Sequence, residues 1–224
     1  MFEAAHFVSA ELGMAATEAL PYEAQWLLLI TLLNEDVSVA RTRGKLRDWF
    51  TATSFYEALK GRPDHALVRM IEEIVSQLKI GEEIAAPPQD IRPTELVTKR
   101  FLRGKATSVA YVQLLIRNGL FSNLPLTDVP YEQFVPIVDR ETLSSAFGRH
   151  VHSARTIGNV VYIPANIFRR LNGNPLNLYD LDPELLSAQF ISRRFLQQIR
   201  KGEVRPALVV RASLIRSAAD RKSD

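Results

Sequence analysis

The sequence contains no cysteine, and only four of its 224 residues are histidines. Without cysteine, the chain has neither a disulfide framework nor thiolate ligands for a metal. Long apolar runs are also missing, since even Trp26–Leu33 is far shorter than the ~18 residues of a membrane span. The first residues, Met1–Glu3, lack the basic flank and apolar core of a signal peptide. We therefore expect a cytoplasmic protein with no membrane partner.

The motifs of several common enzyme classes are absent as well. There is no glycine-rich phosphate loop, no nucleophile elbow and no dinucleotide-binding fingerprint, which disfavours nucleotide-driven and α/β-hydrolase chemistry. A metal site would have to use histidine and carboxylate side chains. His150 and His152 would point to the same side of an extended segment and could share a metal there. A single His-x-His motif is a weak signal, however, and we favour surface histidines.

The charge is divided unevenly along the chain. Residues 1–139 contain 14 Lys+Arg and 18 Asp+Glu, whereas residues 140–224 contain 14 and 7, so the two parts carry net charges of −4 and +7. A strongly basic part usually faces an anion, of which nucleic acid is the commonest example. A solvated basic helix surface is the alternative explanation.

Hydrophobic periodicity predicts a mainly α fold. A helical bundle at residues 1–127 is expected to precede a small α+β subdomain at 128–224, which has a short strand or hairpin and C-terminal helices. The proline-containing segment Ser122–Pro136 is irregular and marks the expected boundary. Helices are predicted at Phe2–Leu12, Ala24–Leu33, Arg41–Phe55, Ala66–Ile80, Thr94–Gly104, Thr107–Arg117, Asp139–Phe147, Asp182–Ala188, Ser192–Lys201 and Pro206–Arg221.

Two apolar features of the first part affect the expected core. Ala24–Leu33 is apolar nearly all round, which predicts a helix buried on every side. Trp49 and Phe50 follow a run of basic residues, an arrangement that can stack nucleobases. We favour the simpler interpretation, in which both rings anchor their helix in the core.

One non-helical segment combines a short apolar strand with amides and arginines. Ile157–Ile163 is rich in β-branched residues and is interrupted by Gly158, which predicts a short strand or hairpin arm. Asn159 lies within this segment, and Arg169 and Arg170 follow it. Functional groups often lie on irregular segments that a regular scaffold positions, so this segment is the first candidate site.

Four segments occur in the order in which similar segments occur in a known bacterial family. They are Leu20–Gln25, Leu46–Phe55, Thr156–Ile163 and Arg211–Ile215. Together they resemble the C-terminal portion of GmrSD-type proteins, a modification-dependent restriction and phage-defence group. Such proteins pair a ParB-like N-terminal domain with a helical region and an HNH-type nuclease module. The ParB-like part has no counterpart in this sequence, so the resemblance implies a remnant, a fragment or a chain with a separate ParB-like partner.

The resemblance also implies an altered catalytic centre. In an HNH module, a histidine general base follows an aspartate and activates water against a phosphodiester, while a divalent metal such as Mg²⁺ stabilises the developing charge. Asp139 matches the aspartate, but Arg140 stands at the position of the histidine. Because arginine stays protonated, it cannot act as the base. His150 or His152 would have to replace the missing histidine.

Three asparagines match polar positions of the same module. The resemblance implies that Asn159 is its orienting asparagine and that Asn166 or Asn172 is its last polar ligand. With the base replaced, the expected module is a degenerate one. It needs no cofactor if it only binds, and a divalent metal if it cleaves.

Three functions follow as alternatives. The favoured one is a non-catalytic, nuclease-related module that binds DNA through its basic C-terminal half. The others are an active metal-dependent endonuclease, in which Asp139 acts with His150 or His152, and a protein-interaction module for a separate ParB-like partner. The arginines expected to contact phosphates are Arg140, Arg155, Arg169, Arg170, Arg193 and Arg194.

Overall fold

The computed structural model describes residues 2–12, 20–84, 91–121, 126–149, 151–171, 177 and 182–221. Most of these residues are helical, and the sheet that they form has two short antiparallel strands. The predicted mainly α fold with a small α+β part is therefore confirmed. Across the ranges just given, no helix is both long enough and apolar enough to cross a membrane.

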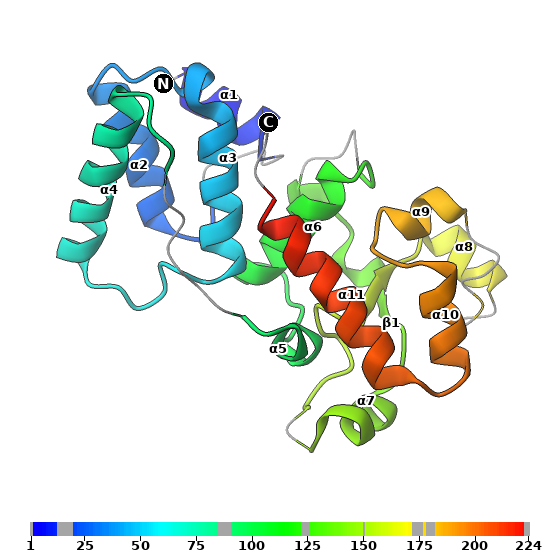
Figure 1. The fold of residues 1–224 in the computed structure, drawn as a ribbon. Helices are drawn as coiled ribbons and strands as arrows, with labels where there is room; N and C mark the ends of the chain where they lie inside the picture. The colour runs from blue at the N-terminus through cyan, green and yellow to red at the C-terminus, as the bar shows by residue number, and fades with distance from the viewer. Residues whose placement is uncertain are drawn as a thin grey trace.

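Four helices form an N-terminal lobe, at the left of Figure 1. They are α1 (Phe2–Ala10), α2 (Glu23–Asn34), α3 (Val39–Phe55) and α4 (Asp64–Lys79). Helices α1 and α2 both pack on α3, and α4 packs on α2. The buried side-chain amide of Gln25 joins α2 to α3, because it donates to Thr53 Oγ1 at 3.0 Å and to Ser54 Oγ at 2.9 Å. Trp49 and Phe50 are buried in this core, as predicted.

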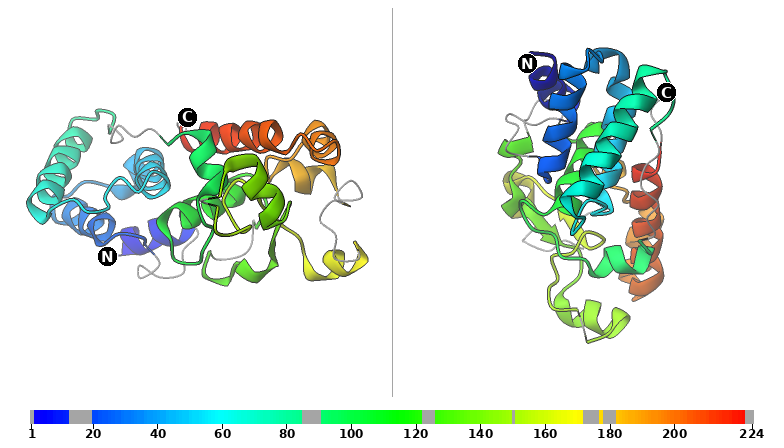
Figure 2. Two further views of the ribbon diagram at one scale, coloured as in Figure 1. Left: turned by 90° about the horizontal axis from the view of Figure 1, so that it is seen from below. Right: turned by 90° about the vertical axis from the view of Figure 1, so that its left-hand side faces the viewer.

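The remaining elements form a second lobe, at the right of Figure 1 and of the left view of Figure 2. Its helices are shorter, apart from α6 and α11, and its strands have three residues each. In chain order the elements are α5 (Pro93–Thr98), α6 (Ala106–Arg117), η2 (Leu126–Asp128), η3 (Tyr131–Gln133), β1 (Phe134–Pro136), α7 (Arg140–Phe147), β2 (Val160–Tyr162), α8 (Ala165–Arg170), α9 (Pro183–Ser187), α10 (Arg193–Arg200) and α11 (Val204–Ala219).

The two lobes share one buried core. Helix α6 is buried from Ala106 to Leu115 and packs on both α3 and α11. Helix α11 also packs on α5, α7 and α10. A single cluster of buried apolar residues runs through both lobes, so the core has no break at the predicted boundary between residues 127 and 128.

Two helix predictions need correction. The predicted buried helix at Ala24–Leu33 corresponds to α2, but Leu27 is 42% exposed and Ile30 is 36% exposed. No described element covers that face, although its composition is apolar. The helix predicted at Thr94–Gly104 ends at Thr98, because Lys99 adopts an extended conformation and Arg100 forms an isolated bridge with Thr156.

The sheet pairs the predicted strand with a segment that was expected to be irregular. Strand β2 lies in the second half of the predicted Ile157–Ile163 run, and its partner β1 lies within Ser122–Pro136. Phe134 pairs with Tyr162. On its other side, Tyr162 exchanges two hydrogen bonds with the Gln189 side chain, at 2.7 Å and 3.1 Å. The amide of Gln189 therefore occupies the edge of β2 where a third strand would bind.

A buried arginine connects α11 to the segments around it. The Arg211 guanidinium donates to the carbonyls of Gly158 at 2.7 Å and Val160 at 2.8 Å. It also donates to the Gln189 carbonyl, at 3.2 Å from Nε and 3.1 Å from Nη2, and to Tyr111 Oη at 2.8 Å. Burial lowers the pKa of Arg211, and burial raises the pKa of the Tyr111 hydroxyl. Arg211 is thus a fully buried cation whose hydrogen-bond partners are carbonyl dipoles and one hydroxyl.

Replacing Arg211 is expected to destabilise the fold strongly. Arg211→Met removes the donor from three carbonyls and from the Tyr111 hydroxyl, and each unsatisfied buried group costs about 1–3 kcal/mol. We expect the free energy of unfolding to fall by at least about 3 kcal/mol, measured by urea denaturation. Tyr111→Phe removes one of these bonds and should cost less. A variant Arg211→Met as stable as the wild type would contradict this role.

Gly158 permits a close approach between two backbones. A Cβ atom added there would lie 2.8 Å from Val97 Cα and 3.0 Å from Val97 Cγ2. We expect Gly158→Ala to destabilise the protein by about 1–3 kcal/mol, because overpacking displaces the backbone of α5. Thermal unfolding measures this change, and Asn166→Ala, at an exposed position of α8, is the control. Equal effects of both substitutions would refute the steric explanation.

Candidate nucleic-acid interface

The first candidate segment, Ile157–Ile163, lies mainly in the interior. The backbone N–H groups of Ile157 and Gly158 donate to the carbonyls of Lys99 and Leu96, at 2.9 Å and 3.1 Å. Ile157, Val160, Val161 and Ile163 are all buried. The segment therefore holds α5 against α11 and presents little surface to a ligand.

Asn159 has its side chain fully engaged with the backbone. Its Nδ2 donates to the carbonyls of Val138 at 2.9 Å and Ala154 at 2.8 Å, and its Oδ1 accepts from the Val138 N–H at 3.1 Å. The residue is completely buried. An amide in this position orients the two chain segments that flank it, and it has no exposed group for a metal or a substrate.

Asp139 forms the N-cap of α7. Its carboxylate accepts from the Thr142 N–H at 2.7 Å, and this hydrogen bond lowers the pKa of Asp139. Arg140 follows as the first residue of the helix and is exposed. Asp139 thus has a local structural role, in which its carboxylate satisfies a free N–H of the first helical turn.

The other residues of the predicted centre are not assembled into a metal site in the described part of the chain. His152 and Asn166 are exposed, and they lie on different segments. His150 and Asn172 lie outside the described residues. Among those that are described, no group of three or more His, Asp or Glu side chains could hold a metal ion.

The predicted phosphate-contacting arginines lie on the surface. Arg155 is exposed and donates from Nη2 to the Tyr131 carbonyl at 2.6 Å. Arg169 and Arg170 end α8 and are also exposed. In Figure 1 both α8 and α10 lie at the right-hand end of the molecule. The left view of Figure 2, turned by 90°, shows that they are apart from each other. They consequently form two basic regions rather than one patch.

Helix α10 carries the densest group of exposed cations. Phe195, Leu196 and Ile199 are buried, and Ser192 caps the helix by accepting from the Phe195 N–H at 3.1 Å. The opposite side, which we call the α10 basic face, is exposed. It consists of Arg193, Arg194, Gln197, Arg200 and Lys201. Sequence reasoning selected the arginine pair and missed Arg200 and Lys201, although a spacing of seven residues returns to the same helix face.

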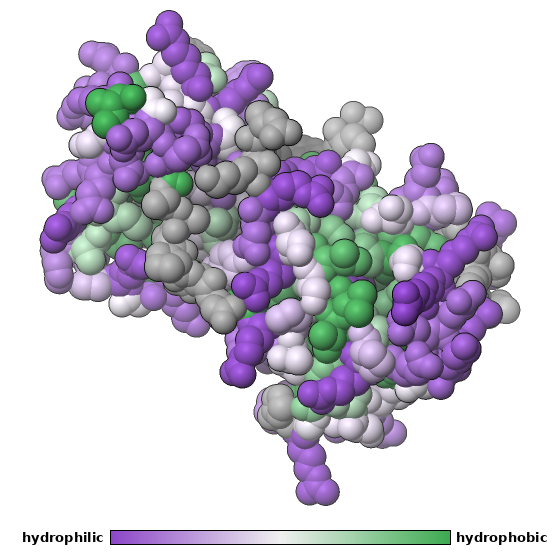
Figure 3. Space-filling view, viewed as in Figure 1, coloured by the Kyte–Doolittle hydropathy of each residue, from purple (hydrophilic) through white to green (hydrophobic). Residues whose placement is uncertain are grey.

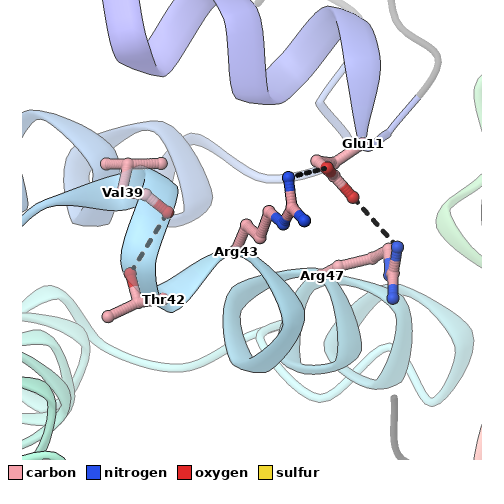
Figure 4. A network of polar contacts seen from close by, with 5 residues as sticks. All are labelled: Glu11, Val39, Thr42, Arg43 and Arg47. Carbon is pink, nitrogen blue, oxygen red and sulfur yellow. Dashed lines mark hydrogen bonds and ion pairs between the residues drawn. The ribbon is translucent and has the colours of Figure 1, made fainter. Parts of the chain in front are cut away.

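Ion pairing differs between the two lobes. In the N-terminal lobe, Glu11 accepts from Arg47 at 2.9 Å and lies 4.0 Å from Arg43, as Figure 4 shows. Lys45, Lys60, Arg69 and Lys79 also face carboxylates. By contrast, six exposed arginines form no ion pair with any residue that the structure describes. They are Arg140, Arg155, Arg169, Arg170, Arg193 and Arg194.

The cap at Asp139 gives a prediction that depends on pH. Asp139→Asn keeps a side-chain acceptor for Thr142 but removes the negative charge near the positive end of α7. Because the folded-state pKa is lowered, the charge stabilises the protein above the unfolded-state pKa and ceases to do so as the pH falls through the folded-state value. We therefore expect the melting temperature of the wild type to exceed that of Asp139→Asn at neutral pH, and this difference to vanish in acid. A difference that persists unchanged in acid would contradict this.

The candidate interface is therefore the α10 basic face, with the arginines of α8 and Arg155 as further cationic groups. It does not coincide with the strand that the sequence first indicated. No family model, no curated protein and no solved structure matches this chain.

Proposed function

We propose that this chain is a non-catalytic, nuclease-related module that binds DNA through its basic C-terminal part. The observation that carries the proposal is the α10 basic face, in which Arg193 and Arg194 have no acidic partner among the described residues. A cation without an internal partner keeps its field available for an external anion. Arginine also matches phosphate geometry, because its guanidinium can donate two parallel hydrogen bonds.

The dimensions of α10 suit a polyanion. Its eight residues span roughly 12 Å, at 1.5 Å per residue. Duplex DNA carries one negative charge per about 1.7 Å of its axis, so a basic face of this length meets several phosphates at once. Contacts to phosphates position a protein but carry no sequence information directly. We therefore expect binding with little sequence preference and strong dependence on salt.

Descent from a GmrSD-type HNH module belongs to the same proposal. Its support is the order of the four similar segments, together with Arg140 at the position of the histidine base. The engagement of Asp139 as a helix cap and of Asn159 with buried backbone favours binding over cleavage. A ParB-like protein is a candidate partner on the basis of the resemblance alone.

Salt titration of DNA binding tests the phosphate contacts on α10. For duplex DNA, the slope of log K against log[salt] is about −0.9 for each neutralised phosphate. The double variant Arg193→Ala/Arg194→Ala should reduce the magnitude of that slope by up to about 1.8 and weaken binding for all sequences alike. Fluorescence anisotropy with a labelled duplex measures both quantities. The control is Arg69→Ala, on α4, whose side chain is 81% exposed and faces Glu73.

Three results would count against the proposal. The first is no binding by the wild type at low salt, and the second is an equal loss in the Arg69→Ala control. The third is nicking of a plasmid by the wild type with Mg²⁺ or Mn²⁺, which would support the endonuclease alternative instead. His152→Ala and His150→Ala would then show whether either histidine serves as the base.

A further inference from the structure

An apolar cleft lies between α2 and α4 in the N-terminal lobe. It has a volume of ≈ 560 Å³ and is lined by the apolar side chains of Trp26, Leu27, Ile30, Leu67 and Val68. Leu27 and Val68 are 42% and 45% exposed. Volumes of about 300–1,000 Å³ are typical of ligand pockets, so several apolar side chains fit into this cleft. We call it the α2–α4 cleft.

The rim of the α2–α4 cleft is acidic. Glu23 and Asp64 line it, each in the first turn of its helix. Glu72 lies four residues beyond Val68, on the same stripe of α4. These three carboxylates are exposed, and none of them forms an ion pair with a described residue. The cleft therefore suits a partner that combines apolar side chains with positive charge.

The second lobe presents a surface of that kind on α11. Pro206, Val210 and Leu214 are exposed and recur every four residues, which places them along one stripe of the helix. Val210 is 55% exposed and Leu214 is 48% exposed. Figure 3 shows a hydrophobic area over α11, bordered by hydrophilic surface over α10. We call this stripe the α11 ridge.

The border of the α11 ridge is basic. Helix α10, whose outer side is the α10 basic face, packs on α11, and Figure 3 shows hydrophilic surface over α10 beside the hydrophobic area over α11. Arg205, next to Pro206, is also exposed. An apolar ridge beside cations is thus complementary to an apolar cleft with an acidic rim. Like charges at either surface would disfavour pairing of two clefts or of two ridges.

We infer that copies of this chain associate head to tail, with the α11 ridge of one copy in the α2–α4 cleft of the next. The two surfaces belong to different lobes, and α3, which contacts both α2 and α11, lies between them in Figure 1, so one chain cannot bring its own ridge into its own cleft. A contact between two different surfaces is heterologous, and it leaves a free cleft and a free ridge on the pair. This inference goes beyond DNA binding and does not depend on it.

Two variants that introduce charges into the apolar surfaces test the inference through their mixture. The cleft variant is Leu27→Glu/Val68→Glu, and the ridge variant is Val210→Glu/Leu214→Glu, so the two altered surfaces carry charges of the same sign and do not pair with each other. All four side chains are exposed, so circular dichroism and thermal unfolding should show intact folds. Sedimentation equilibrium then measures the mass of each protein as its concentration rises.

For the wild type we expect a mass that increases with concentration from that of the 25.3 kDa chain beyond twice that value. Each variant alone should remain at the mass of one chain. An equimolar mixture should stop at twice the mass of one chain, because one intact cleft and one intact ridge form a single contact. Ile80→Lys should assemble like the wild type, because this apolar residue is 71% exposed and follows the last residue of α4, whereas the cleft residues on α4 lie in the first half of that helix.

Each of the other outcomes would overturn the inference. A wild type that stays at the mass of one chain at the highest concentration excludes association. Variants that assemble like the wild type show that another surface mediates it. A mixture that fails to pair, when the wild type does assemble, excludes the contact between this cleft and this ridge.

Discussion

The buried guanidinium of Arg211 is the interaction on which the second lobe depends. It joins α11 to the turn before β2, to the end of α9 and to α6 through hydrogen bonds of 2.7–3.2 Å. A buried charge is costly unless its environment stabilises it, and here carbonyl dipoles do so in place of a carboxylate. A carbonyl dipole stabilises the guanidinium only while its oxygen points at it, because the interaction depends on distance and on orientation. The position of α11 and the conformation at residues 158–160 are therefore fixed together.

This constraint changes the meaning of the segments that carry the family resemblance. Gly158, Asn159 and Arg211 all belong to them, and all three are buried with structural partners. Gly158 allows the close approach to α5, and Asn159 binds the backbone of Val138 before α7. Arg211 donates to the carbonyls of Gly158 and Val160. Similar residues in a nuclease could surround an active centre. In this chain these three residues are part of the interior, whereas the exposed cations lie on α8 and α10.

The sequence predicted the features that depend on local periodicity. The amphipathic pattern located α4 and α10 to within a few residues, because each buries one side of a helix. Helix α6 was located equally closely, although it is buried on all sides from Ala106 to Leu115. Strand β1 could not be predicted, since its three residues pair with residues 24 to 28 positions later and include Pro136. The role of Arg211 was likewise hidden, because nothing local distinguishes a buried arginine from its exposed neighbours. The exposure of Leu27 and Ile30 on α2 was not predicted either, because composition shows that a helix is apolar but not how many neighbouring elements cover it.

The distribution of ion pairs links the two proposals. The N-terminal lobe pairs most of its cations but leaves Glu23, Asp64 and Glu72 without partners among the described residues, whereas the second lobe leaves Arg193 and Arg194 in the same state. Phosphates and these carboxylates would therefore compete for the same guanidinium groups. Linkage makes such competition reciprocal: DNA that occupies the α10 basic face weakens head-to-tail association by the same factor by which association weakens DNA binding. Because the apolar part of the contact is insensitive to screening, salt should weaken DNA binding more steeply than association. The balance between the two states would then shift toward association as ionic strength rises.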